Sequence, residues 1–159
     1  MKRQMASNVL KILLILFGVG VIFFGTYVLP RMANEMSVFY PELEYAKVSV
    51  LGISELLLGL LILGIVIIMS LLKKFDQNNT FTFKFTKGLE ILVGLCVLAS
   101  VGLIGLFLFL FWVGGPGPLL SLIMIGLIFI IWIVSAVIML IRSIVIESMT
   151  YKDDYDLTV

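Results

Sequence analysis

Residues 91–141 read ILVGLCVLASVGLIGLFLFLFWVGGPGPLLSLIMIGLIFIIWIVSAVIMLI, which is fifty-one consecutive positions without a charged side chain. About 20 apolar residues in a helix cross the ~30 Å hydrocarbon core of a bilayer, so this stretch is too long for one crossing and suits two. Gly-Gly-Pro-Gly-Pro at 114–118 divides it, because proline lacks a backbone donor and glycine favours turns. The sequence therefore predicts a tight hairpin at 114–118 between membrane helices over 88–113 and 119–146.

Two further apolar runs precede this stretch. The first covers 12–30, and the second covers 48–72 with Glu55 as its one charge. They predict membrane helices over 9–29 and 48–72. A cleaved signal peptide is the alternative for the first run, because its start is basic. No A-x-A-like cleavage site follows, so we expect the helix to be retained.

The composition supports a membrane protein. Hydrophobic residues make up 62% of the 159 positions, charged residues 13%, and the mean hydropathy is +1.22. Soluble domains carry about 25% charged residues, so a soluble globular domain is excluded. The apolar runs are continuous and do not alternate, which excludes a transmembrane β-barrel. We expect one all-α domain over 1–159, a polytopic membrane protein with four transmembrane helices in an antiparallel bundle.

The positions of lysine and arginine predict the orientation. One side of the predicted bundle has nine: Lys2, Arg3, Lys11, Lys73, Lys74, Lys84, Lys87, Arg142 and Lys152. The other side has only Arg31 and Lys47. Cytoplasmic loops carry the excess of positive charge, so we expect both termini, the loop 73–87 and the tail 147–159 in the cytoplasm. The loop 30–47 and the hairpin then lie on the outer side of the membrane. We expect this membrane to be a bacterial inner membrane.

Several kinds of chemistry are excluded. The chain has no histidine and a single cysteine, Cys96, so Ser-His-Asp triads, Cys-His pairs and zinc-type sites cannot be assembled. It has no P-loop and no dinucleotide fingerprint. We therefore expect a protein that is not an enzyme, with no catalytic residue, cofactor or metal. The net charge of +1 gives no reason to expect direct nucleic-acid binding.

Glu55 is the one charge well inside a predicted span. A carboxylate there costs ~2.5 kcal/mol or more, so we expect it to face the bundle or to be protonated. It is a candidate proton- or ligand-responsive site. The structural alternative is a carboxyl group that bonds to a neighbouring helix, for example through Ser54 or Ser121.

Glu90 and Arg142 form a candidate interfacial pair. They lie near the cytoplasmic ends of two helices that we expect to be antiparallel, so their depths are similar. A salt bridge between them is one expectation, and snorkelling of Arg142 to the headgroups is the other.

The loop 73–87 and the tail have opposite charge. Phe81, Phe83 and Phe85 alternate with polar residues, so an extended segment would place them on one face. The loop is either an interfacial stretch on anionic lipid or a docking surface for a cytoplasmic protein. The acidic tail is either solvated or engages a basic partner. The candidate docking residues are Lys73, Lys74, Lys84, Lys87, Asp153, Asp154 and Asp156.

The pattern resembles a known family. A basic, Asn-containing loop leads into Thr80-Phe81-Thr82, a Gly/Pro hairpin precedes a Leu/Ile/Gly-rich helix, and the chain ends Asp154-Tyr155-Asp156-Leu157-Thr158-Val159. Together these resemble the YoaS-like bacterial membrane proteins, a four-helix family of unknown function. The family tail has asparagine where this chain has Tyr155. Phe83-Lys84 departs from the family's Glu-Asn pair, so no role is carried over to that pair.

This resemblance implies a genomic setting, because such proteins are often encoded beside a small helix-turn-helix regulator. It implies a non-enzymatic sensor or sequestering partner of that cytoplasmic regulator. A small transporter, channel subunit or immunity-type membrane protein is the alternative. Lipid is the other expected partner, and the sequence leaves a homo-oligomer open.

Overall fold

The computed structural model describes residues 2–39, 41, 44–77, 82–114 and 117–156, without the side chains of 2–6, 36, 39 and 152–156. All the regular structure in this part of the chain is helical. The elements, in order, are α1 (Lys2–Phe23), the π-helical turn η1 (Phe24–Val28), α2 (Leu29–Phe39), α3 (Glu44–Asp76), α4 (Phe83–Val113) and α5 (Pro118–Asp156).

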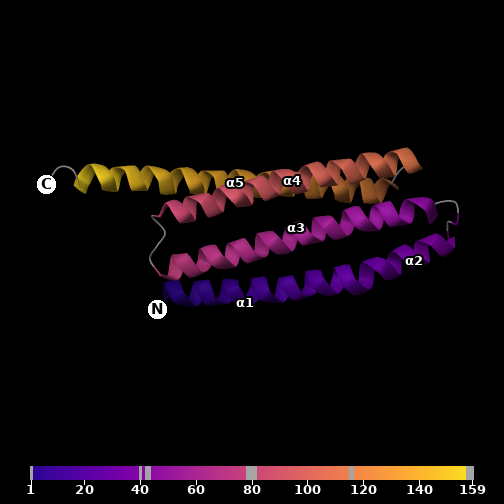
Figure 1. The fold of residues 1–159 in the computed structure, drawn as a ribbon, viewed down its shortest axis with the longest axis horizontal. Coiled ribbons are helices and arrows are strands. Elements are labelled where there is room, and N and C mark those ends of the chain that lie inside the picture. The colour runs from indigo at the N-terminus through magenta and orange to yellow at the C-terminus, as the bar shows by residue number, and fades with distance from the viewer. Residues whose placement is uncertain (1, 40, 42–43, 78–81, 115–116, 157–159) are drawn as a thin grey trace.

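Four helical segments are long and apolar enough to cross a membrane. They cover Ser7–Glu35, Glu44–Asp76, Phe83–Val113 and Pro118–Tyr151. Successive spans run antiparallel, so both ends of the chain lie at the same end of the molecule as the connection from α3 to α4 (Figure 1). We call this the basic end, because Lys73, Lys74, Lys84 and Lys87 lie there. The expected all-α fold with four antiparallel spans is therefore confirmed.

The helices pack mainly against their neighbours in the sequence. α4 and α5 have the most extensive contact, followed by α3 with α4 and then α1 with α3. Close packing of α3 on α4 depends on glycine. A Cβ atom added at Gly88 would lie 2.7 Å from Leu71 Cδ2, and one added at Gly102 would lie 2.8 Å from Leu57 Cδ2. Small residues allow such approach between membrane helices, so these two contacts define the antiparallel register of the pair.

The best-packed part of the molecule lies near the basic end. The buried side chains there are Leu71, Phe85, Leu89 and Leu92. Most large apolar side chains elsewhere point outward from all four spans. An apolar exterior of this extent is the surface expected against hydrocarbon, since water would make it an aggregation site. Contact with the lipid bilayer follows from it.

The first span does not end where the sequence predicted. We expected a helix over 9–29 and a loop over 30–47, but the helix continues through Pro30 to Phe39. Pro30 cannot donate to the carbonyl four residues earlier, and its ring clashes with that carbonyl. The π-helical turn directly before it widens the backbone, and the Leu29 N–H donates to the Phe24 carbonyl five residues back. The proline is thus accommodated within the helix.

The basic end also departs from expectation. The loop 73–87 is shorter, since α3 ends at Asp76 and α4 begins at Phe83. Phe83 and Phe85 are helical rather than extended, with side chains 73% and 8% exposed, so they do not share a face. Phe81 lies outside the described residues. The segment predicted as a tail, 147–159, is helical as far as Asp156. The hydrocarbon sets the length of the apolar run only, so a polar segment can continue the helix beyond it.

Candidate functional site

The predicted docking lysines occupy two helix ends. Lys73 and Lys74 lie in the last turn of α3, whereas Lys84 and Lys87 lie in the first turns of α4. Thr82 caps α4, and its carbonyl accepts from the Phe85 N–H at 2.8 Å. Thr82 is thus the residue at which α4 begins.

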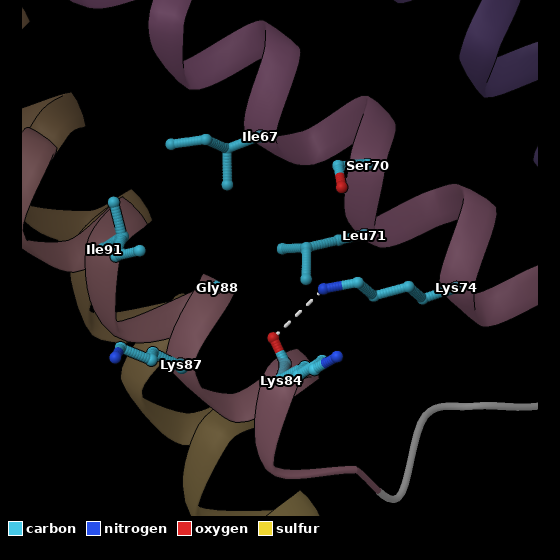
Figure 2. Close-up of a pocket in the computed structure, with 8 residues that line it drawn as sticks. All are labelled: Ile67, Ser70, Leu71, Lys74, Lys84, Lys87, Gly88 and Ile91. Atoms are coloured by element: carbon cyan, nitrogen blue, oxygen red, sulfur yellow. Dashed lines mark hydrogen bonds between the residues drawn. The ribbon is translucent and has the colours of Figure 1, made fainter.

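Three of these lysines line a groove between α3 and α4, and the fourth does not. Lys74, Lys84 and Lys87 line one end of the groove, and the Lys74 Nζ donates to the Lys84 carbonyl at 3.2 Å (Figure 2). Lys73 is exposed and does not line the groove. We call this feature the α3–α4 groove.

Glu90 and Arg142 are brought together. The Arg142 Nη2 donates to Glu90 Oε2 at 3.2 Å. The two side chains are 39% and 63% exposed, so the pair is screened and contributes at most about 1 kcal/mol. The Arg142 Nε is buried and has no partner within the described part of the chain. The contact matters mainly because it marks the register of α5 on α4.

That register makes α5 project beyond its neighbours. α4 begins seven residues before Glu90, so the corresponding level on α5 is seven residues after Arg142, near residue 149. The rest of α5, to Asp156, extends by about 10 Å at 1.5 Å per residue. Figure 1 shows this end of α5 past the ends of α1, α3 and α4. Asp153, Asp154 and Asp156 belong to this projection, although their side chains lie outside the described part.

Glu55 does not face the bundle. Its side chain is exposed on α3. It has no hydrogen-bond or ion-pair partner among the residues that the structure describes. Ser121, one of the expected partners, instead donates to the Gly117 carbonyl at 3.2 Å. The expectation that the bundle shelters this carboxyl group in a single copy is therefore wrong.

Sequence reasoning missed an ion pair between Lys11 and Asp76. It joins α1 to the last residue of α3, and the two side chains are only 27% and 24% exposed. A signal was present, because Lys11 directly precedes the first apolar run and Asp76 closely follows the second. In antiparallel neighbours these positions have the same depth.

A metal centre finds no support in the described residues, where no three His, Cys, Asp or Glu side chains gather at ligand distance. At this end, three lysines line the groove, and the projecting part of α5 carries three aspartates in its sequence. Residues of opposite charge thus lie on different elements, and each set can bind a charged partner.

Comparison with known proteins identifies the family. No curated protein and no solved structure matches the chain. Residues 31–159 match the family described as "Protein of unknown function (DUF2975)", so the match takes in α3, α4 and α5 in full and leaves out α1. Since this is well over half of the sequence, the chain belongs to the DUF2975 family.

Proposed function

We propose that this protein is a non-enzymatic membrane partner that senses or sequesters a small cytoplasmic helix-turn-helix regulator. The proposal places the protein in a bacterial inner membrane with the basic end in the cytoplasm. The resemblance to YoaS-like proteins supports the class of partner, and the excess of lysine and arginine at the basic end supports the orientation.

The observation that carries the proposal is the projection of α5. It ends in Tyr151-Lys152-Asp153-Asp154-Tyr155-Asp156, with three acidic residues and one basic residue on a helix that extends past the other spans. Regulators that bind DNA through a helix-turn-helix present a basic surface to phosphate. An acidic helix held at the membrane is complementary to that surface, and binding there would compete with DNA.

The opposite end offers less charge for a partner. Arg31 Nε pairs with Glu35 Oε1 at 3.5 Å, and the Lys47 Nζ contacts Ser37 Oγ at 3.5 Å. Arg31, Glu35 and Lys47 thus each contact a residue of α2, which favours the basic end as the side that meets a protein partner.

The test uses the full chain in nanodiscs and the helix-turn-helix protein encoded beside its gene. Replacing Asp153, Asp154 and Asp156 by Asn should weaken capture of the regulator about tenfold or more, and the loss should shrink at high salt. Duplex DNA carrying the regulator's site should displace the regulator from the unchanged protein.

A matched control changes the same number of acidic groups at the opposite end, with Glu35, Glu42 and Glu44 replaced by Gln. This variant should capture the regulator as the unchanged protein does. Equal capture by the two triple variants, or failure of DNA to compete, would contradict the proposal.

A transport or immunity role would rest on Glu55. Its position on the outer surface of α3 does not favour a pathway through a single copy.

A further inference from the structure

The α3–α4 groove is built from two matching stripes. On α3 it is lined by Ile67, Ser70, Leu71 and Lys74, which follow the i, i+3, i+4, i+7 spacing of one helix face. On α4 the lining residues have the same spacing: Lys84, Lys87, Gly88 and Ile91. Because the helices are antiparallel, Lys74 lies opposite Lys84 and Leu71 lies against Gly88. The groove is therefore lined by one face of each helix.

The groove changes character along its length. Figure 2 shows Lys74, Lys84 and Lys87 at the end nearest the α3–α4 connection, with Ile67 and Ile91 at the far end, toward the middle of the spans. The Ser70 hydroxyl and Leu71 lie between these ends. Polarity thus falls from charged to apolar along the helix axes, in the same direction as from headgroup to acyl chain in a bilayer.

The positive charge of the groove is not neutralised. Lys74 donates to a backbone carbonyl, and none of the three groove lysines forms an ion pair with a side chain that the structure describes. Glu90, the first acid that follows them on α4, is engaged by Arg142. The amino-terminal end of α4 adds partial positive charge, because its first N–H groups are not all bonded within the helix. A compact anion would complement the positive charge of the groove.

The floor of the groove is well packed. Leu71 is buried in the cluster with Phe85, Leu89 and Leu92, and Gly88 allows α4 to approach it. The volume is about 290 Å³, just below the ~300–1,000 Å³ typical of small-ligand sites. That space suits a headgroup and the first part of an acyl chain, with the remainder of the lipid lying along the outside.

We propose that the α3–α4 groove is a binding site for an anionic phospholipid. The phosphate lies among Lys74, Lys84 and Lys87, and one acyl chain follows Ile67 and Ile91 toward the bilayer centre. Basic pockets between membrane helices at the cytoplasmic surface are suited to acidic headgroups. The proposal does not depend on the regulator, because it rests on the groove and not on α5.

Native mass spectrometry of the detergent-solubilised full chain measures this binding. With phosphatidylglycerol, the spectrum should show a distinct complex of one protein with one lipid, which we call the one-to-one component. Phosphatidylcholine should not give this complex. Replacing Lys74, Lys84 and Lys87 together by Gln should weaken that component about tenfold or more. Replacing Arg31, Lys47 and Lys73 by Gln removes the same charge away from the groove and should leave the component intact. Equal loss in both triple variants would overturn the proposal, since it would mean that net charge alone attracts the lipid.

A variant that keeps every lysine tests the space in the groove separately from its charge. Ser70→Phe fills the middle of the groove without altering a lysine, and Ser70 is exposed, so the fold should tolerate it. It should abolish the one-to-one component, whereas Ser143→Phe, at an exposed position of α5, should not. Retained binding in Ser70→Phe, with an unchanged melting curve, would overturn the site.

The source of the phosphate is tested by competition. Inorganic phosphate and glycerol 3-phosphate at millimolar concentration should fail to displace phosphatidylglycerol, because they lack the chain that contacts Ile67 and Ile91. Displacement by either would overturn a lipid site and indicate a site for free anions.

Discussion

Gly88 on α4 lies so close to Leu71 on α3 that a Cβ atom at Gly88 would come within 2.7 Å of Leu71 Cδ2. Leu71 is only 6% exposed and has little room to move. Gly88→Leu should therefore lower the melting temperature, with a loss of about 1–3 kcal/mol from overpacking. Gly94 lies on the same helix with nothing within 4 Å of an added Cβ. Gly94→Leu should be neutral or stabilising, and a similar loss in both variants would contradict the packing of α3 on α4.

The ion pair between Lys11 and Asp76 should stabilise the contact of α1 with α3. Both side chains are mostly buried, so we expect a coupling free energy of about 1–2 kcal/mol, above that of an exposed pair. A double-mutant cycle with Lys11→Met and Asp76→Asn measures it by thermal melting in detergent. Lys73→Met is the matched control at an exposed position. Strictly additive losses would show that the two groups do not interact.

The pair between Glu90 and Arg142 should contribute less. Its side chains are 63% and 39% exposed, and exposed pairs contribute about 0–1 kcal/mol. A cycle with Glu90→Gln and Arg142→Gln should therefore give a coupling below that of Lys11 with Asp76, and 0.5 M salt should reduce it further. A larger coupling here than at Lys11 would reverse the ranking inferred from burial.

The topology predicts which positions are labelled from the same side of the membrane. In a Cys96→Ala background, Gln77→Cys and Tyr151→Cys should react with an impermeant maleimide from one side, and Tyr45→Cys from the other. The first two positions lie at the basic end, and the third lies in the first turn of α3 at the opposite end. Labelling of Gln77→Cys and Tyr151→Cys from opposite sides would contradict four spans.

The number and order of the spans could be predicted from the sequence because hydrocarbon admits few alternatives. The ends of the helices could not be predicted, since the bilayer determines only the length of the apolar part of a helix. Pro30 reads as a helix end, yet one π-helical turn accommodates it. Asp153 and Asp154 read as tail, yet they continue α5 as polar helix.

The groove could not be predicted for a different reason. Lys73 and Lys74 are adjacent in sequence, but one residue is a rotation of about 100° around a helix. Only the packing of α3 on α4, through Leu71 and Gly88, determines that Lys74 lines the groove and Lys73 does not. The same limit applies to Glu55, whose outward direction depends on which faces of α3 the neighbouring helices cover.

α5 runs unbroken from Pro118 to Asp156, 39 residues and about 58 Å. The helix is continuous from its start after the hairpin to its acidic tip. A tilt of about 5° at one extremity shifts the other by roughly 5 Å over this length. A change of tilt at the hairpin end of α5 would therefore move Asp153 and Asp154 at the other end.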